Sequence, residues 1–176
     1  MRRLRYNVAM SLDGYIADAH DAFDWIVHDE TVDFAGLFAR VDTIMLGRRS
    51  YDLVRAQGTP PWKPGTRVFV VSRTLAPESR DGVTIVSSDP AAIASSLRRE
   101  SGDGEIWLFG GGQLFAALLD GNQVDAVEVT IVPVLLGGGV PMLAHTGGRT
   151  SLALADTHVY PSGMVALYYT VPGAAA

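Results

Sequence analysis

The sequence predicts an α/β fold: one mixed, mostly parallel central sheet with helices on both faces, ending in an antiparallel pair of strands. Apolar, β-type runs alternate with helical patterns over residues 4–119, which is typical of parallel strands joined by crossover helices. After Val124 the pattern is β-rich and carries no helical period. Residues 152–160 and 164–171 then read as two strands joined at Pro161-Ser-Gly163, which predicts the antiparallel pair.

The segment 105–115 joins these two regions and carries a clear local signal. Its apolar residues end in Gly110-Gly-Gly112, and a helical pattern follows, which indicates a buried strand, a tight turn and a helix start. Glycine lets the main chain approach a ligand closely, and a helix start offers unpaired N–H groups that suit a phosphate. The alternative is a glycine-rich corner that binds no ligand.

The first elements follow from periodicity and turn residues. Residues 4–10 are predicted as the first strand, 11–14 as a turn and 15–17 as a short extended return. A helix is predicted over 31–41, because its apolar residues fall on one face and acids precede it. Those apolar residues are Phe34, Leu37, Phe38 and Val41.

The central elements continue to alternate between strand and helix. Residues 43–46 are predicted as the second strand, followed by a helix that begins within 47–50 and runs to about Gln57. Residues 58–65 form a proline-rich loop around Trp62. Further strands are predicted at 67–71 and 83–86, and a helix from Pro90 to about Glu100 with Asp89 as its N-cap.

Length and composition limit the possible functions. The 176 residues, 48% hydrophobic and 19% charged, predict a single globular domain over 1–172 with a frayed tail at 173–176. The net charge of −5 argues against a general nucleic-acid binder. The absence of cysteine excludes disulfides and thiolate metal sites and fits a reducing cytoplasm, and no apolar run is long enough for a membrane span. We expect no metal, because no metal-ligand spacing links His20, His28, His145 and His158.

Residue types that bind phosphate follow three of the predicted strands, at 47–50, 72–74 and 110–112. Ligands in open α/β sheets gather outside the carboxyl ends of parallel strands. Together the three segments predict a dinucleotide site, with arginine and hydroxyl groups for an additional 2′-phosphate. The alternative is that the arginines of the first two segments are solvated surface charges.

Five segments occur in the order seen in a known superfamily: M-S-L-D-G-Y-I-A (10–17), I-M-L-G-R-R-S-Y (44–51), V-V-S-R-T-L (70–75), W-L-F-G-G-G-Q-L-F (107–115) and V-P-V-L-L-G-G-G-V-P-M-L (132–143). Over nearly its whole length the chain resembles the dihydrofolate reductase-like superfamily. The first and last segments are more similar to the C-terminal reductase domain of the bacterial bifunctional riboflavin deaminase-reductase. The resemblance implies a three-layer α/β/α fold and an NADPH-dependent reductase.

The resemblance also implies positions for the cofactor. The backbone of Ala9 and Ile16 matches positions that hold the nicotinamide carboxamide, residues 48–50 match the binding site of the cofactor phosphates, and 72–74 match the 2′-phosphate pocket. Residues 110–114 match the turn under the pyrophosphate, where a non-proline cis peptide is expected. The implied cofactor-binding residues are Ala9, Ile16, Gly47, Arg48, Arg49, Ser50, Ser72, Arg73, Thr74, Gly110, Gly111, Gly112, Gln113 and Leu114.

Fewer residues point to the substrate. The superfamily's true dihydrofolate reductases place a carboxylate at the start of the first helix, and the matching candidates here are Glu30 and Asp33, with Asp29 nearby. The alternative is that these are ordinary helix-start acids. Asp13 and Trp62 are candidates for lining the substrate site, although a turn aspartate and a packed tryptophan are the competing interpretations.

The sequence therefore predicts an NADPH-dependent reductase that transfers hydride to a small planar heterocycle. That heterocycle is either an aminopyrimidine, 5-amino-6-(5-phosphoribosylamino)uracil-like, or a pterin, dihydrofolate-like. A nucleotide-binding module of the same fold without turnover is the alternative. A Rossmann dehydrogenase is disfavoured, because Phe115 stands where G-x-G-x-x-G needs its third glycine. The resemblance also implies a homodimer, in which the β-rich back half pairs with a second copy.

Overall fold

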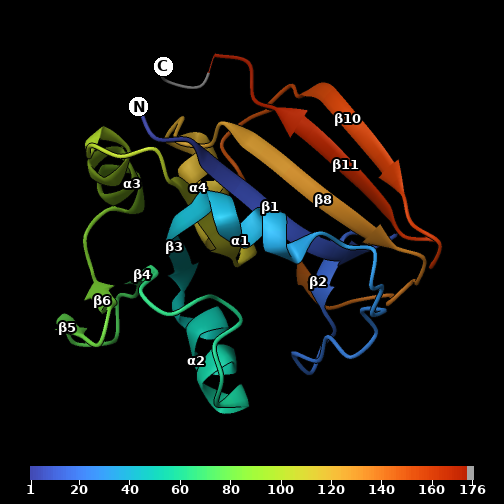
Figure 1. Ribbon diagram of the computed structural model, residues 1–176, viewed down its shortest axis with the longest axis horizontal. Helices are drawn as coiled ribbons and strands as arrows, with labels where there is room; N and C mark the ends of the chain where they lie inside the picture. Colours follow the sequence, from blue (N-terminus) through green and yellow to red (C-terminus); the bar gives the residue numbers. More distant parts are fainter. Residues whose placement is uncertain (174–176) are drawn as a thin grey trace.

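A computed structural model describes residues 1–173, and its centre is a nine-stranded sheet (Figure 1). In spatial order the strands are β10 (Ala153–Val159), β11 (Val165–Thr170), β8 (Ala126–Val132), β1 (Leu4–Ser11), β7 (Glu105–Gly110), β3 (Val41–Gly47), β4 (Arg67–Val71), β6 (Val83–Val86) and β5 (Glu78–Arg80). A second, two-stranded sheet pairs β2 (Tyr15–Ala17) with β9 (Val140–Pro141). The helices are α1 (Phe34–Arg40), α2 (Arg48–Gln57), α3 (Pro90–Arg99) and α4 (Gly112–Asp120).

The strands from β8 across to β6 run parallel, and antiparallel neighbours flank them at both edges of the sheet. At one edge β11 pairs with β8, and β10 pairs with β11. At the other edge β5 pairs with β6. The predicted mixed, mostly parallel sheet with a closing antiparallel pair is confirmed.

Strand β5 is absent from the sequence-based prediction, because Glu78-Ser-Arg80 contains no apolar residue. Its signal lies in the following turn. Asp81 and Gly82 both have positive φ, 51° and 80°. An Asp-Gly pair of this kind favours a two-residue hairpin, and it was the available clue to the strand.

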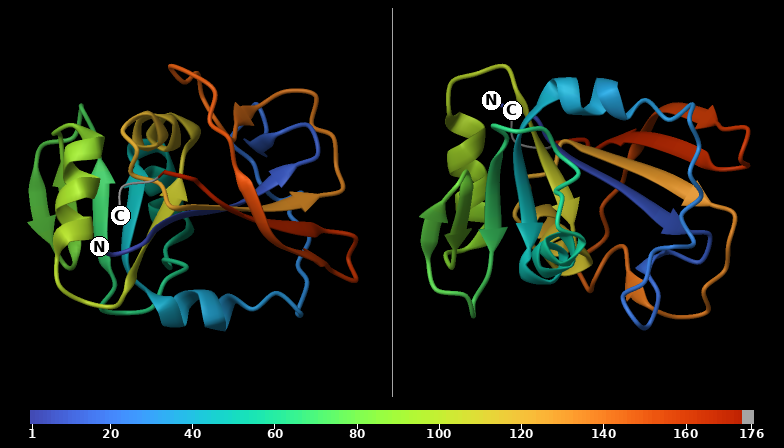
Figure 2. Two further views of the ribbon diagram at one scale, coloured as in Figure 1. Left: turned by 90° about the horizontal axis from the view of Figure 1, so that it is seen from above. Right: turned by 60° about the horizontal axis from the view of Figure 1, so that its bottom comes forward.

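Helices cover both faces of the parallel strands, as Figure 2 shows. On one face α3 and α4 bury Leu97, Phe115 and Leu118 against Leu4 and Leu108 of the sheet. The opposite face packs against α1 and α2 in a second cluster. Its members include Leu37, Phe38, Tyr51, Ile44, Leu46, Val68, Val70 and Trp107. The three-layer α/β/α arrangement is therefore confirmed.

Helix α1 is shorter than predicted, because a capping residue sets its start. The Asp33 side chain accepts a hydrogen bond from the Gly36 backbone N–H (2.7 Å), so the helix begins at Phe34 rather than at Thr31. Thr31 instead donates its N–H (2.9 Å) and its hydroxyl (2.6 Å) to Asp29. Residues 29–32 are consequently a turn that precedes the cap.

The antiparallel strands carry a third, smaller core cluster. A third cluster packs Val132, Tyr160 and Ala166 against Trp25 and Val32 of the segment between β2 and α1. On β10 all seven residues are exposed. Figure 1 shows β10 and β11 extending away from the helices, which gather around the parallel strands.

The tail predicted to fray, 173–176, lies outside the described residues apart from Gly173, whose carbonyl accepts a hydrogen bond from the Asn122 side chain (3.0 Å). Within residues 1–173 no helix combines the length and the apolar character that a bilayer crossing needs.

Candidate functional site

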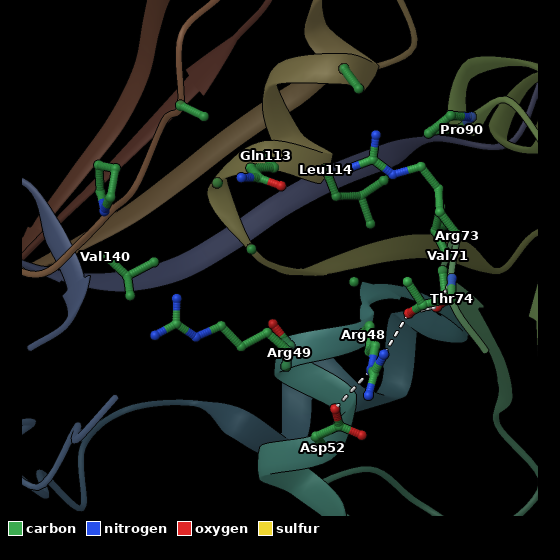
Figure 3. A pocket seen from close by; sticks show the side chains of 18 of the residues that line it. Arg48, Arg49, Asp52, Val71, Arg73, Thr74, Pro90, Gln113, Leu114 and Val140 are labelled. Carbon is green, nitrogen blue, oxygen red and sulfur yellow. Dashed lines mark hydrogen bonds and ion pairs between the residues drawn. The ribbon is translucent and has the colours of Figure 1, made fainter. Parts of the chain in front are cut away.

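A cleft of about 1250 Å³ opens at the carboxyl ends of β3, β4 and β7 (Figure 3). Its size exceeds the roughly 300–1,000 Å³ of most small-ligand sites, which suits an extended ligand. The three predicted segments converge on it because β3 pairs in parallel with both β4 and β7. The lining residues that the sequence analysis named are Gly47, Arg48, Arg49, Ser50, Ser72, Arg73, Thr74, Gly111, Gly112, Gln113 and Leu114.

Three further segments that line the cleft were not predicted from the sequence. Asp18 and Ala19 follow β2, residues 139–141 contain β9, and residues 87–90 lead from β6 into α3. The segment 87–90 could have been predicted to line the cleft, because the N-cap Asp89 and Pro90 directly follow a predicted parallel strand. The segments 18–19 and 139–141 come together only through the pairing of β2 with β9, and no local sequence pattern predicts that pairing.

The arginines at the start of α2 already have acidic partners. Arg48 donates Nε–H to the Asp52 carboxylate (3.2 Å) and also bonds the Thr74 hydroxyl. Arg49 donates Nε–H to Asp21 (2.9 Å), which lies between β2 and α1. Both side chains stay about half exposed or more, so their charges remain available to a ligand that enters the cleft.

Arg73 differs from these two arginines. Among the described residues it makes no hydrogen bond and no ion pair, and in the view of Figure 3 its guanidinium reaches across the cleft. The turn that carries it is held by Ser72, whose buried hydroxyl accepts from the backbone N–H groups of Thr74 (3.2 Å) and Leu75 (3.0 Å). The turn therefore places the Arg73 guanidinium, which has no acidic partner among the described residues, at the carboxyl end of β4.

The glycine turn brings backbone close to the cleft. The Gly110–Gly111 peptide is cis, as the resemblance implied, and α4 begins directly afterwards. Neither α4 nor α2 has a side-chain hydrogen bond at its N-cap, because Gly111 and Gly47 occupy those positions. A β-carbon added at Gly112 would lie 2.4 Å from the Pro141 carbonyl oxygen, so only glycine fits there. Two uncapped helix starts lining one cleft are suited to an anion.

The remaining predicted residues lie outside this cleft. Ala9 packs against the third core cluster, Ile16 belongs to β2, and Gly110 lies within β7 without lining the cavity. Glu30 and Asp33 are exposed, and Asp33 caps α1. Their predicted roles in cofactor binding and catalysis stay predictions.

Asp13 links two turns rather than lining the cleft. Its carboxylate accepts from the Ser11 hydroxyl (2.6 Å) and from the N–H groups of Leu136 (3.1 Å) and Gly137 (2.7 Å). The Ser11 hydrogen bond, with help from these N–H groups, lowers the pKa of Asp13 below its ordinary value. The S-L-D-G segment thereby ties the end of β1 to the glycine-rich loop before β9.

Trp62 packs on the sheet face that α1 and α2 cover. Its ring meets Phe109 edge-on with centroids 5.7 Å apart, and Phe109 lies 5.0 Å from Trp107. Phe38 of α1 continues this row at 5.9 Å from Trp107. The sequence signal for the row was the spacing of Trp107 and Phe109, because alternate residues of a strand point to one face.

Acidic and imidazole side chains do not gather into a metal site. Within residues 1–173 no three or more His, Asp or Glu residues lie close enough together to hold an ion.

Comparison with known proteins places these features among relatives. A family model for the RibD C-terminal domain matches residues 2–167. The uncharacterized protein YyaP of Bacillus subtilis (strain 168) is 28% identical, over 96% of this chain and 94% of its own. A crystal structure of a candidate riboflavin biosynthesis protein from Shewanella sp. PV-4 superposes with a TM-score of 0.83 at 29% identity, covering 97% of this chain and 99% of its own.

A more distant structure shares the fold. The diaminohydroxyphosphoribosylaminopyrimidine deaminase/5-amino-6-(5-phosphoribosylamino)uracil reductase of Thermotoga maritima gives a TM-score of 0.73 at 16% identity. The match covers 97% of this chain and 56% of that protein.

Proposed function

We propose that this chain, which belongs to the RibD C-terminal domain family, is an NADPH-dependent reductase of a small planar heterocycle. The observation that carries the proposal is the convergence of three strand ends on one cleft that holds Arg73 without a partner among the described residues. An aminopyrimidine substrate is favoured by the resemblance to riboflavin-pathway proteins, and a pterin is the second choice.

The cleft fits a doubly anionic nucleotide on three counts. The uncapped starts of α2 and α4 offer backbone N–H groups to a pyrophosphate. Arg73 and the Thr74 hydroxyl offer a cation and a donor to a 2′-phosphate. Third, the absence of a β-carbon at Gly112 lets the start of α4 pack directly on Pro141 of β9, which fixes that helix start at the cleft wall.

In the proposed mechanism the protein positions the reactants, and bound NADPH supplies the hydride. Arg48 and Arg49 would exchange part of their contact with Asp52 and Asp21 for the ligand's phosphates. Asp18, Ala19 and β9 line the same cleft as the start of α2 and would contact a ligand bound there. Of the aromatic side chains Trp62, Phe109 and Trp107, Trp107 is buried in the core, so only the half-buried Trp62 and Phe109 would contact a heterocycle.

A nucleotide-binding module without turnover is a second candidate. It is favoured by the placement of Glu30 and Asp33, the predicted acids, outside the cleft and by the capping role of Asp33. A reductase needs a proton source for its product, and neither acid lines the cavity.

The first experiment tests cofactor selectivity. Titration calorimetry with NADPH and NADH is carried out on the wild type and on Arg73→Ala, with Arg80→Ala as the control because Arg80 lies on β5, outside the cleft. Arg73→Ala should weaken NADPH binding by about 1.5–3 kcal/mol, roughly 10- to 150-fold, and NADH binding far less. Equal losses for both nucleotides would remove the 2′-phosphate assignment.

The second experiment separates the two candidates. Oxidation of NADPH is followed with a panel of aminopyrimidines and pterins. Turnover with any of them supports the reductase, whereas tight NADPH binding without turnover across the panel supports the nucleotide-binding module.

A further inference from the structure

Four polar side chains form a chain of contacts across three neighbouring strands, β7, β1 and β8. Glu105 of β7 accepts two hydrogen bonds from the Arg5 guanidinium, each 2.7 Å long. Arg5 also bonds one oxygen of the Glu128 carboxylate, whose other oxygen accepts from the Asn7 amide (2.8 Å). Arg5 and Glu128 are buried, whereas Asn7 is half-buried. The chain of contacts therefore ends in a side chain that a ligand can reach.

The Glu128 carboxylate fixes which way the Asn7 amide points. An ionised carboxylate accepts hydrogen bonds and donates none, so the NH2 group of the amide must face Glu128. The amide oxygen Oδ1 then faces away from Glu128. Within residues 1–173 it accepts no hydrogen bond, and it is not one of the buried polar atoms that lack a partner, so it meets solvent. Asn7 consequently presents a hydrogen-bond acceptor to its surroundings.

Asn7 lies beside Phe109, one of the aromatic side chains proposed above to contact a heterocycle. Arg5 is paired with Trp107 in the parallel register of β1 and β7. Two residues further along each strand, Asn7 and Phe109 are therefore neighbours that project from the same face of the sheet. The Trp107 indole also donates to the Asn7 backbone carbonyl (3.1 Å). A flat ring in contact with Phe109 would have its edge close to the Asn7 acceptor.

The charges next to Asn7 balance one another. Arg5 and Arg40 carry the positive charges, and Glu105 and Glu128 carry the negative ones. Arg5 contacts both acids, and Arg40 Nε lies 4.0 Å from Glu105. A phosphate at this place would meet guanidinium groups that already have carboxylate partners. An uncharged N–H donor suits the acceptor of Asn7 better.

We propose that Asn7 determines substrate specificity by accepting a hydrogen bond from an amino group on the heterocycle. Glu128 is then a positioning residue, because it holds the amide with its oxygen toward the ligand. The inference rests on the proposed function, since it takes the heterocycle to lie against Phe109. It narrows the substrate class to heterocycles that carry an amino group at the edge facing β1. A methyl group in the same place would desolvate the acceptor without pairing it.

A binding measurement tests the role of Asn7 without requiring turnover. NMR titration of the full chain with millimolar NADP+ present compares 6-aminouracil with 6-methyluracil, in which a methyl group replaces the amino group. The wild type should bind 6-aminouracil at least about five-fold more tightly. Asn7→Leu, which is similar in size and has no acceptor, should bind both compounds equally. Asn7→Ala makes the same test if the leucine variant does not fold.

Glu128→Gln tests the orientation of the amide. To keep its bond to Arg5, the glutamine must turn its carbonyl oxygen to the guanidinium and its NH2 group to Asn7. Asn7 would then present its own NH2 group, and the preference for 6-aminouracil should disappear. A purely structural role of Glu128 would instead weaken both compounds by the same factor. Glu100→Gln is the matched control, because Glu100 pairs with Arg67 at the start of β4 (2.7 Å), and it should keep the preference.

The results that overturn this inference differ from those that overturn the proposed function. A wild type without preference for 6-aminouracil, or a preference that survives in the Asn7 variants or in Glu128→Gln, would remove the specificity role of Asn7. Oxidation of NADPH with the panel of aminopyrimidines and pterins would still support the reductase in that case. Failure to bind NADPH in calorimetry would refute the proposed function itself.

Discussion

The two halves of the sheet obey the same pairing rules but have different surroundings. The connections from β3 to β4 and from β6 to β7 carry the helices α2 and α3, which lie on opposite faces and begin at the same edge of the sheet. Strands β10 and β11 are joined by the short turn after Tyr160, which brings no helix with it. The comparison shows that the long connections place helix starts beside the strand ends at the cleft, whereas the short connection leaves β10 without a covering helix.

The largest loss of stability is expected from a substitution at the pairing of β8 with β1. This pairing joins β8 and the antiparallel strands β11 and β10 to the remaining parallel strands. Glu128 is buried there, bonded to the Arg5 guanidinium and to the Asn7 amide (2.8 Å). Glu128→Gln leaves Arg5 with Glu105 as its remaining carboxylate partner and should lower the free energy of unfolding by about 3 kcal/mol in urea titrations.

The control for Glu128→Gln is a substitution on the edge strand β10. Asp156→Asn removes an exposed carboxylate from β10 and should change the free energy of unfolding by less than about 0.5 kcal/mol. If the two substitutions changed the free energy of unfolding equally, the contact between Arg5 and Glu128 would not stabilise the pairing of β8 with β1. The backbone hydrogen bonds alone would then hold these strands together.

An intermediate effect is expected at the contact between α4 and β9. The β-carbon of Gly112→Ala would meet backbone at 2.4 Å, so β9 must move, at a cost of about 1–3 kcal/mol in thermal or urea unfolding. Gly138→Ala is the matched control, because nothing lies within 4 Å of its added β-carbon. Equal free energies of unfolding for Gly112→Ala and Gly138→Ala would contradict the close packing of α4 on β9.

The smallest effect is local and depends on pH. The Asp13 hydrogen bonds lower the pKa of that carboxyl, so the tether to Leu136 and Gly137 is complete above the ordinary aspartate pKa of about 3.9 and is lost as the pH falls through the depressed value. Asp13→Asn should speed amide exchange at Leu136 and Gly137 at neutral pH while leaving the rest of the chain unchanged. Asp103→Asn serves as the control, and unchanged exchange in Asp13→Asn would contradict the tether.

Local sequence signals were sufficient where one element and its cap determine the structure. The apolar strands, the Asp89 cap and the strand–glycine–helix turn at Gly110 all follow from short-range periodicity and turn chemistry. The convergence of three strand ends also followed, because parallel pairing puts carboxyl ends at one edge. The cis peptide came from the family resemblance and is found at Gly110–Gly111.

Long-range contacts account for what the sequence did not indicate. Arg5 and Glu128 are 123 residues apart, and each alone resembles a surface charge in a strand. The Asp18 and β9 walls of the cleft depend on the pairing of two short strands from opposite ends of the chain. The exposure of β10 depends on which distant segments pack beside it, and periodicity alone does not decide that.

The position of β1 also has a consequence for biosynthesis. It is translated well before its neighbours on both sides, β7 and β8, which are formed from residues 105–132. Until those residues emerge, the nascent strand carries two open edges and its core side chains stay in water. The native pairing of β1 therefore forms only after residue 132 has been translated, however early the strand itself emerges.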